Sequence, residues 1–413
     1  MDKYSSYKDS GVQWIGQIPS HWEVKHLRNF LTIFSEKGFD NAQLLSVTRE
    51  KGVILRDRDD KEENHNYVPD DLSGYKHLMS GDFVINKMKS WQGSYGVSKY
   101  EGIVSPAYFT CKLRGVDPQF FSQAIRSKAY IGFFMQYSKG IRVDQWDLDP
   151  SSMKDIPFIL PPLDEQKKIV PYLDAATAKI DEAIAQQQRM IDLLNERKQI
   201  VINNAVTRGV SSCTTYRESG YDWIGVIPSH WEIRKLKYYV TPSREKAYKA
   251  LPYIGLENIE SHTGKFILTD SEYDINQSLL CNKNDVIFGK LRPYLAKAYL
   301  CDRNYCCSNE FVVMRDTPVP KFLQYVLLST YFVNKVDAST YGAKMPRADI
   351  DYILNLPIAI PPVNEQGEIV RSVNEQFSII DKMIAPKAKL LSLLQERKQI
   401  IINDVVTGKV KVF

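Results

Sequence analysis

The sequence lacks the features of secreted and membrane-spanning proteins. No run of apolar residues approaches the roughly 20 that a membrane-spanning helix needs, and the opening residues Met1–Lys8 contain no apolar signal core. The six cysteines show no paired spacing of the kind that disulfide frameworks and zinc sites use. These absences lead us to expect a protein of a reducing compartment, with the cytoplasm as its location.

Motifs that bind nucleotides and cofactors are also missing. The sequence has neither a Gly-x-x-x-x-Gly-Lys-Ser/Thr loop for phosphates nor a Gly-x-Gly-x-x-Gly turn for a dinucleotide. The Pro-Pro pairs at 161–162 and 361–362 are similar to part of an amino-methyltransferase motif, but Leu160 and Ile360 stand where a polar residue would accept the target amine. We expect these pairs to be stiff helix starts, and we expect no cofactor on this chain.

Two further constellations have weak catalytic interpretations. Glu165-Gln-Lys167 fits part of a metal-nuclease motif, but the second copy, Glu365-Gln-Gly367, has lost the lysine. His21 and His230 occur in matching Ser-His-Trp blocks, yet no third group or oxyanion site accompanies them. We expect both histidines to be buried or capping, and we predict no catalytic residue and no metal site.

Length and composition indicate a folded protein of several domains. At 413 residues the chain is too long for one ordinary core. Its 44% hydrophobic and 25% charged residues are typical of folded proteins that are soluble in water. The net charge of +5 is compatible with a polyanionic partner but does not require one.

The dominant feature of the sequence is an internal repeat. The segment Leu193–Asn203 returns as Leu393–Asn403 with only two differences. An earlier segment, Tyr7–Val24, returns as Tyr216–Ile233 with 12 of 18 positions identical. Glycine and proline exclude a helix there, so we expect an extended clamp whose anchors in the first copy are Trp14, Ile15, Ile18 and Trp22.

Two mixed regions lie between the repeated segments, from Lys25 to about Pro150 and from Arg234 to about Asn355. In the first region, 81–86 and 108–113 read as strands and Asp117–Tyr137 reads as one helix. Strand-like segments at 156–162 and 356–362 end the two regions. The regions share this order of elements but little sequence, as diverged copies do.

A long helix is predicted after each mixed region, with Asp164 and Asn364 as N-caps. Apolar residues recur there at intervals of threes and fours, in the first helix at Ile169, Leu173, Ala176, Ile180, Ile184, Ile191, Leu194 and Val201, and in the second at Val370, Val373, Phe377, Ile380, Ile384, Leu391, Leu394 and Ile401. In each helix these residues form one long and narrow apolar stripe, the seam of the helix. A seam of this length favours coiled-coil packing over a helix buried in a core. The first helix must run from the first mixed region to the second, and the second helix must run back toward the first region. The two helices are therefore expected to be antiparallel.

Basic residues recur at matched places in the two mixed regions. Lys87 and Lys89 match Lys290 and Arg292 at an offset of 203, and each pair follows a predicted strand. Aromatic or amide residues follow these pairs, namely Trp91 and Gln92 in the first region and Tyr294 in the second. A second basic pair follows the helical part of each region, Lys139 and Arg142 in the first and Lys344 and Arg347 in the second. Such side chains bind phosphates and base edges. A solvated surface charge is the simpler interpretation for any one of them, but their recurrence predicts a DNA-binding set.

Three paired motifs carry a specific resemblance. They are Trp-Ile-Gly-x-Ile-Pro-x-His-Trp at 14–22 and 223–231, Pro-Pro-x-x-Glu-Gln at 161–166 and 361–366, and Glu-Arg-Lys-Gln-Ile at 196–200 and 396–400. With them the chain resembles, over its whole length, the specificity (S) subunit of type I restriction–modification systems. The resemblance implies two target recognition domains, each reading one half of a bipartite DNA site, and no catalysis by this chain. It also implies a pair of modification subunits that carry S-adenosylmethionine and methylate adenine, joined by restriction subunits that use ATP and Mg²⁺.

The expected fold is α+β: two mixed α/β target recognition domains joined by two long antiparallel coiled-coil helices, with a pseudo-twofold internal repeat. The expected boundaries are 1–162 for the first domain with its clamp, 163–208 for the first helix, 209–362 for the second domain with its clamp, and 363–413 for the second helix. Three alternatives stay open: a recognition subunit of a type II-like methyltransferase–nuclease, an enzyme in its own right, and a purely structural coiled-coil adaptor.

Overall fold

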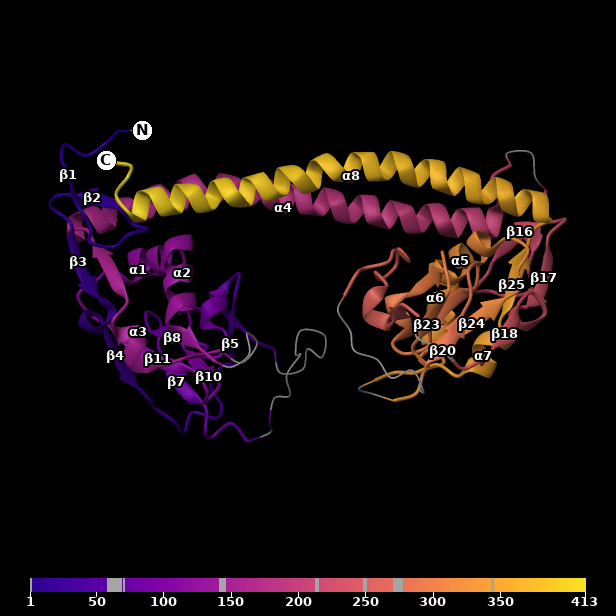
Figure 1. The fold of residues 1–413 in the computed structure, drawn as a ribbon, viewed down its shortest axis with the longest axis horizontal. Helices are drawn as coiled ribbons and strands as arrows, with labels where there is room; N and C mark the ends of the chain where they lie inside the picture. Colours follow the sequence, from indigo (N-terminus) through magenta and orange to yellow (C-terminus); the bar gives the residue numbers. More distant parts are fainter. Residues whose placement is uncertain are drawn as a thin grey trace. The chain divides into compact units, whose positions relative to one another are not determined.

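A computed structural model describes residues 2–57, 69, 71–140, 146–211, 215–247, 251–269, 278–342 and 345–413 (Figure 1). The chain divides into two units. The first unit comprises Met1–Gln186 and Leu390–Phe413, and the second comprises Gln187–Lys389. Each unit therefore joins one mixed α/β region to the first half of one long helix and the second half of the other. None of the helices in the described part is long and apolar enough to cross a membrane.

The first unit opens with the expected extended segment. Strand β1 (Tyr7–Asp9) pairs antiparallel with β2 (Gln17–Pro19), and β3 (Glu23–His26) pairs antiparallel with β14 (Pro157–Leu160). Ile15, Ile18 and Trp22 are buried, as predicted. Trp14 is 53% exposed, so its prediction as an anchor is wrong. It lies in the turn between β1 and β2, where its ring contacts Phe133 at a centroid distance of 5.3 Å.

The mixed region of the first unit is built on a four-stranded antiparallel sheet in the order β4-β11-β8-β9. Its strands are β4 (Leu31–Phe34), β8 (Phe83–Ile85), β9 (Tyr95–Val97) and β11 (Phe109–Leu113). Smaller antiparallel pairs are β5 (Leu45–Thr48) with β6 (Gly52–Leu55), β7 (Lys76–Leu78) with β10 (Gly102–Val104), and β12 (Ser138–Lys139) with β13 (Asp147–Leu148). Successive side chains of a strand point to opposite faces. Phe83 and Ile85 accordingly join the large core of the unit, whereas Val84 joins a smaller core on the other face.

The helices of this region are α1 (Pro118–Ile125), α2 (Lys128–Tyr137) and α3 (Pro150–Lys154), with short 3₁₀ helices η1 (Leu27–Asn29) and η2 (Ser90–Gln92). The prediction of one helix over 117–137 is wrong, because the chain turns between α1 and α2. The Arg126 guanidinium lies at this break and donates to the backbone carbonyls of Tyr95, at 2.7 Å, and Glu50, at 2.6 Å. Those contacts fasten the break to two loops that are distant in sequence.

The second unit repeats the same order of elements. Its clamp pairs β15 (Tyr216–Glu218) with β16 (Val226–Pro228), and β17 (Glu232–Lys235) with β25 (Pro357–Ile360). Its four-stranded sheet runs β18-β24-β21-β22, from β18 (Thr241–Ser243), β21 (Val286–Gly289), β22 (Ala298–Leu300) and β24 (Phe311–Arg315). The position of each strand in this sheet matches that of its counterpart in the first unit.

The remaining elements of the second unit complete its core. A three-stranded sheet contains β19 (Tyr253–Ile254), β23 (Tyr305–Cys307) and β20 (Leu279–Cys281), and β19 pairs parallel with β23. The helices are α5 (Pro320–Leu328), α6 (Thr330–Asp337) and α7 (Ile350–Asn355), with 3₁₀ helices η4 (Leu236–Tyr238), η5 (Leu256–Asn258) and η7 (Pro293–Leu295). α5 is buried along almost its whole length against the sheet.

The two long helices are α4 (Leu163–Arg208) and α8 (Val363–Val406). Each begins one residue before the predicted N-cap, so the prediction that Asp164 and Asn364 are N-caps is wrong. The carbonyl of Pro162 accepts from the backbone N–H groups of Glu165 and Gln166, and Asp164 lies within the first turn. The seam residues predicted from the spacing are all buried or half-buried.

Ion pairs join α4 to α8 within each unit. In the first unit, Lys398 of α8 binds both carboxylate oxygens of Asp181 of α4. In the second unit, Lys198 of α4 binds Asp381 of α8, and its ammonium lies 5.3 Å from the Phe377 ring centroid. Lysines at matched places in the repeated Glu-Arg-Lys-Gln-Ile motif therefore bind aspartates at matched places on the other helix.

Candidate nucleic-acid interface

Each clamp is fastened to the start of a long helix by a glutamate. In the first unit, the Glu165 carboxylate accepts from the indole Nε1 of Trp22 at 2.8 Å and lies 2.7 Å from Nε2 of His21. In the second unit, Glu365 accepts from Trp231 at 3.0 Å and lies 2.8 Å from His230. Both histidine rings are about half exposed, so the expectation of buried or capping histidines is wrong. The glutamate binds these groups of its own chain and is accounted for structurally.

The first predicted basic loop follows β8 directly. Its 3₁₀ helix η2 presents Trp91 and Gln92, and Gly93 closes it with a φ of 92°, a left-handed conformation that favours glycine. Lys89 is exposed, whereas Lys87, Trp91 and Gln92 are half-buried. This local structure presents cationic, aromatic and amide groups within one short loop.

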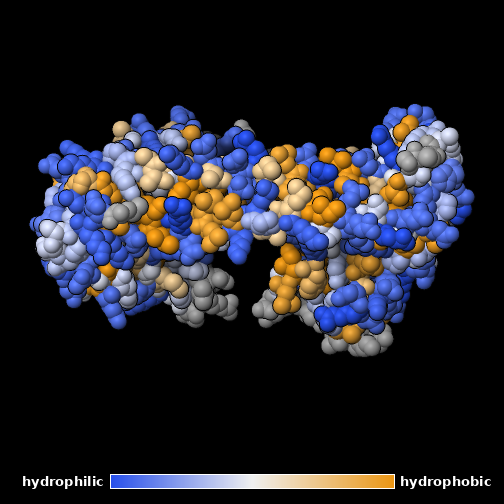
Figure 2. All heavy atoms as spheres, turned by 90° about the horizontal axis from the view of Figure 1, so that it is seen from above, coloured by the Kyte–Doolittle hydropathy of each residue, from blue (hydrophilic) through white to orange (hydrophobic). Residues whose placement is uncertain are grey.

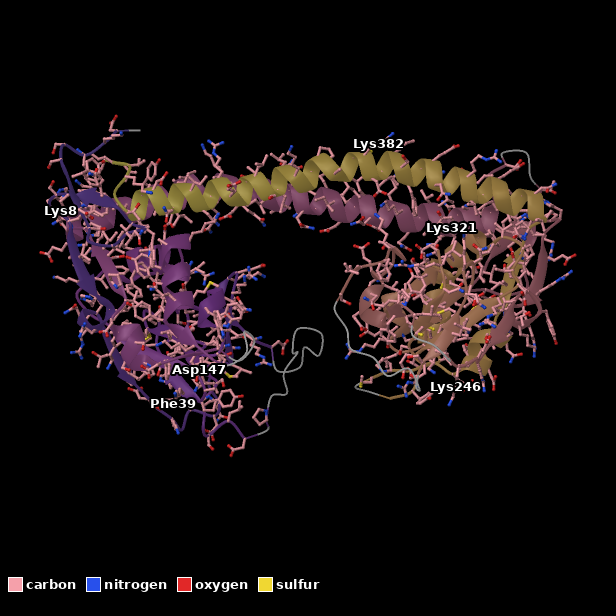
Figure 3. The ribbon with its side chains drawn as sticks, in the orientation of Figure 1. Lys8, Phe39, Asp147, Lys246, Lys321 and Lys382 are labelled. Atoms are coloured by element: carbon pink, nitrogen blue, oxygen red, sulfur yellow. The ribbon has the colours of Figure 1, made fainter. Side chains whose placement is uncertain are left out.

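The structure brings this loop together with the second predicted basic site of the first unit. The Lys87 ammonium lies 2.9 Å from Asp147 Oδ2, and Asp147 is the cross-strand partner of Lys139 in the β12–β13 pair. The backbone N–H of Leu148 donates to the carbonyl of Lys87, and the hydroxyls of Ser90 and Ser138 lie 3.2 Å apart. Figure 3 labels Asp147, which lies on the side of the unit away from α4 and α8. Arg142 falls outside the described residues.

Two tryptophans line the same place. The rings of Trp91 and Trp146 are 5.4 Å apart and inclined by 60°. Trp91 Nε1 and Asp147 Oδ1 are buried, and neither has a hydrogen-bond partner in the described part of the chain. A donor and an acceptor without partners, beside an aromatic pair, are suited to polar groups and ring faces of a ligand.

The second unit assembles its loops in the same way. The carbonyl of Lys290 accepts from the backbone N–H of Ala348, as that of Lys87 does from Leu148. Leu291 pairs with Arg347 through an isolated β-bridge, and Arg292 donates its backbone N–H to Pro346 at 2.7 Å. Arg292 adopts a left-handed backbone with a φ of 50°, which is strained for a residue with a side chain. Lys344 falls outside the described residues.

The ion pairing differs between the two sites. Arg347 Nη2 lies 2.6 Å from Glu310, while Lys290 Nζ donates to the carbonyl of Asn309 at 2.7 Å. Buried atoms again lack partners in the described part, here Arg347 Nε and Glu310 Oε2. Tyr294, in η7, is exposed. Both sites thus hold cations and an aromatic residue in two adjoining loops, but different partners hold the cations.

These pairings leave the cations available to a polyanion. The Lys87–Asp147 pair is partly exposed, and an exposed ion pair contributes only about 1 kcal/mol or less. A phosphate can therefore replace the aspartate at little cost. Sequence reasoning missed Trp146, Asp147 and Glu310, because neither the repeat nor a local spacing connects them to the basic residues. The DNA-binding role of the predicted residues stays a prediction.

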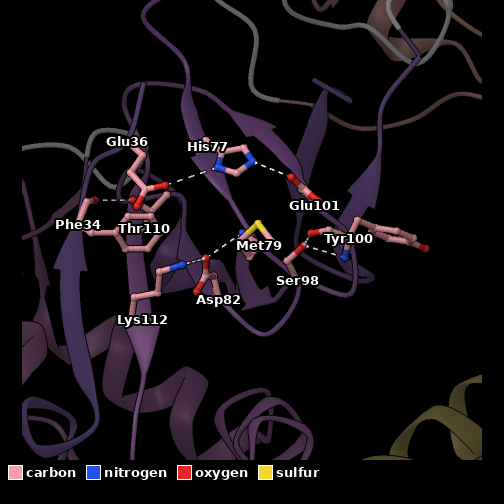
Figure 4. Close-up of polar contacts among 10 residues, drawn as sticks. All are labelled: Phe34, Glu36, His77, Met79, Asp82, Ser98, Tyr100, Glu101, Thr110 and Lys112. Carbon is pink, nitrogen blue, oxygen red and sulfur yellow. Dashed lines mark hydrogen bonds and ion pairs between the residues drawn. The ribbon is translucent and has the colours of Figure 1, made fainter. Parts of the chain in front are cut away.

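A buried carboxylate supports the strand that leads into each loop. Asp82 accepts from the backbone N–H of Met79 and from the Lys112 ammonium, both at 2.8 Å (Figure 4). Asp285 accepts from the backbone N–H of Asn282 at 2.8 Å and from Arg315 at 3.0 Å. Burial raises the pKa of Asp285, and the hydrogen bonds from Asn282 and Arg315 oppose that rise. The carboxylates fix the turns before β8 and β21, and with them the starts of the loops.

Another polar cluster of the first unit has a structural explanation. His77 lies between two carboxylates, with Nε2 at 3.2 Å from Glu101 and Nδ1 at 3.6 Å from Glu36 (Figure 4). The Phe39 ring stacks on the His77 ring at a centroid distance of 4.0 Å. The cluster joins β7 to flanking segments of the sheet. No group of three or more histidine, cysteine, aspartate or glutamate residues within the described ranges is placed to hold a metal ion.

The two units share one order of elements and carry different polar sites on their loops. Residues 231–385 match the family model described as "Type I restriction modification DNA specificity domain". The specificity subunit of the type I restriction enzyme MjaVIII from Methanocaldococcus jannaschii is 23% identical over 96% of this chain and 94% of that protein. The EcoKI specificity subunit from Escherichia coli is 20% identical over 95% of this chain and 90% of that protein.

A solved structure has the same fold. A chain from the structure described as "Structural basis underlying complex assembly and conformational transition of the type I R-M system" aligns with a TM-score of 0.58 at 14% identity, over 95% of this chain and 99% of that one. At that identity the likeness concerns the fold alone. Together with the sequence relatives, it confirms the resemblance to specificity subunits of type I restriction–modification systems.

Proposed function

We propose that this chain is the DNA sequence-specificity subunit of a type I restriction–modification enzyme. One observation carries the proposal. The clamps and the long helices, which together form the frame of the chain, are repeated closely, while the basic loops of the two mixed regions differ. The Trp22–Glu165 contact has an equivalent in Trp231–Glu365. By contrast, Asp147 binds Lys87 in one site, and Glu310 binds Arg347 in the other. A protein that reads two different half-sites from one architecture needs this combination.

The two mixed regions are the proposed target recognition domains. Their cations would hold DNA phosphates, and Trp91, Gln92 and Tyr294 would meet bases or sugars. α4 and α8 would act as an antiparallel coiled coil that sets the unread spacing between the half-sites. The antiparallel pairing of the helices within each unit and the shielded seam residues support this part of the proposal.

The repeated frame also suits two copies of one partner, because two similar surfaces bind two similar proteins. We propose a pair of modification subunits as that partner, with restriction subunits joining the assembly. S-adenosylmethionine, ATP and Mg²⁺ would be bound by those subunits in the cytoplasm. This chain would contribute recognition and no catalysis. None of the comparisons favours the type II-like alternative.

Reconstitution with purified modification subunits tests the proposal. The combined proteins should methylate DNA at a bipartite sequence, and this chain alone should show no methylation, ATPase or cleavage activity. Turnover by the chain alone that a point substitution within it abolishes would overturn the non-catalytic role. Failure to bind DNA with or without modification subunits would favour a structural adaptor.

A further inference from the structure

A short hairpin of the second unit lies between the basic loop at 290–295 and the long helices. We call this hairpin, residues 259–266, the brace. Its two ends pair through an isolated β-bridge, and Phe266 packs against the smaller hydrophobic core of the unit. Gly264, at the tip, has a left-handed φ of 63° and lies so close to the Ala298 carbonyl that a side chain there would clash. The brace is therefore fixed to its own domain at both its base and its tip.

The tip of the brace holds the 3₁₀ helix η7, which carries Tyr294. The backbone N–H of His262 donates to the carbonyls of Leu295 and Ala296, at 3.2 and 3.3 Å. Ala296 has a left-handed φ of 46°, and Arg292, at the other end of η7, has one of 50°. A non-glycine residue keeps such a backbone only where the surrounding contacts hold it. The brace therefore supplies part of what keeps this loop in its strained shape.

The same tip is tied to the long helices. Figure 2 shows polar side chains and apolar patches along the surface of these helices, and the brace contacts polar side chains of both. The side-chain amide of Gln199 in α4 donates to the His262 carbonyl at 2.7 Å. Lys265 Nζ lies 3.8 Å from Asp381 of α8, which also binds Lys198 of α4. Because Lys265 and Asp381 are both exposed, their ion pair adds little, and the Gln199 hydrogen bond is the main tie.

We propose that the brace is a positioning element, which fixes the second basic loop to the helix pair and so sets how strictly the enzyme measures the unread spacer. The inference rests on the proposed function and makes it more specific. One additional base pair moves a half-site by about 3.4 Å along the DNA axis and turns it by about 35°. A loop tied through the brace to α4 cannot follow such a displacement, whereas a loop without this tie is free to do so. Helix length then sets the preferred spacer, and the brace sets the tolerance around it.

Release of the brace from the helices tests this role. Gln199→Ala with Lys265→Ala removes both contacts, and neither side chain is fully buried. The variant, assembled with modification subunits, would methylate duplexes whose spacer has the native length or is one base pair longer or shorter. The wild type should prefer the native spacer, and the double variant should lose roughly tenfold of that preference, the order expected when two polar contacts are lost. General destabilisation would lower the rates on all three duplexes together and leave their ratios unchanged.

Two matched controls separate the brace from its surroundings. Gln399→Ala changes the counterpart of Gln199 in the repeated motif of the first unit. Leu268→Ala shortens a side chain that follows the brace and is 86% exposed. Both variants should keep the spacer preference of the wild type, because neither changes a contact of the brace with the helices.

Gly264→Ala is the second variant, because the added methyl group meets the Ala298 carbonyl and displaces the tip. It should loosen the spacer preference in the same way, with both half-site sequences retained. A folded double variant with the wild-type preference, or equal loosening by Gln399→Ala, would overturn the role of the brace while leaving the proposed function intact. A wild-type complex that methylates no bipartite site would overturn both.

Discussion

Trp22 donates its indole N–H to the Glu165 carboxylate over 2.8 Å, and this hydrogen bond fastens the clamp to the first turn of α4. Trp22 is fully buried, so removal of the acceptor leaves a buried donor without a partner. The same relationship links Trp231 to Glu365. A scaffold that must hold two different domains in the same way therefore uses one contact twice.

Loss of that acceptor should destabilise the unit in which it lies. Glu165→Ala should lower the free energy of unfolding of the first unit by about 1–3 kcal/mol, the usual cost of a buried polar group left unpaired. Urea unfolding followed by tryptophan fluorescence would measure it. Glu165→Gln keeps an acceptor and is the matched control, expected to lose less. Equal stability of the wild type and both variants would show that the hydrogen bond contributes nothing.

The basic loops should govern DNA affinity. Lys87→Ala with Lys89→Ala, and separately Lys290→Ala with Arg292→Ala, should weaken binding by the complete enzyme, each through its own half-site. A phosphate contact predicts uniform weakening with a shallower salt dependence, whereas a base contact predicts relaxed specificity of about 1–3 kcal/mol. Binding would be measured over a range of salt concentrations.

Asp147→Asn provides the converse test of the same loop. It releases Lys87 from its ion pair, so affinity should rise and the salt dependence should steepen. Unchanged affinity in both double variants and in Asp147→Asn would mean that these residues are solvated surface.

Buried thiols should report local opening of each unit. Burial raises the pKa of Cys111 in the first unit to about 12, and in the second unit contact with Cys281 and burial raise the pKa of Cys301. In a chain carrying Cys213→Ser, which removes the cysteine outside the described residues, a thiol reagent at pH 8 should label neither until denaturant is added. Rapid labelling of Cys111 in the native protein would contradict its burial.

The same shifts predict a loss of stability in alkali. A folded chain that keeps these thiols protonated binds more protons than the unfolded chain above the ordinary thiol pKa of about 8.5. Stability is therefore complete below that pH and falls as the pH rises toward 12. Cys111→Ser should reduce the slope of unfolding free energy against pH, measured by urea titration.

The length of the helices should set the distance between the half-sites. Inserting seven residues near Gln187 of α4 and near Lys387 of α8 adds about 10 Å and keeps the apolar seam in phase. At about 3.4 Å per base pair, the unread spacer should lengthen by up to about three base pairs while both half-site sequences stay the same. Methylome mapping in a strain with both insertions would show it. An active enzyme with the original spacer would exclude the helices as the determinant.

The repeat and the helical spacing made much of the frame predictable. Ile18, Trp22 and the α4 seam are buried because their positions follow a local period or a duplicated motif. Trp14 belongs to the same motif but is 53% exposed. Its counterpart Trp223 packs against Tyr331 of α6, where α2 has Ala129. A motif alone does not reveal what packs against it.

The details of the loops could not be predicted for a related reason. Asp147 lies 60 positions from Lys87, and Arg126 ends α1 by binding carbonyls of residues 49, 50 and 95. Such contacts arise from the tertiary fold and have no local period. The basic residues themselves could be found because they recur, while their acidic partners do not. This left the frame more predictable than the candidate DNA-binding sites.

Exchange of one recognition domain tests the central claim most directly. Residues 25–155 would be replaced by the first recognition domain of another specificity subunit, and methylated adenines would be mapped across the genome of a strain carrying the chimera. If each recognition domain reads its half-site independently, one half-site should change to that of the donor subunit. The other half-site and the spacer should stay the same. Methylation with both half-sites altered, or with both unchanged, would contradict the claim that each unit reads its own half of the DNA site.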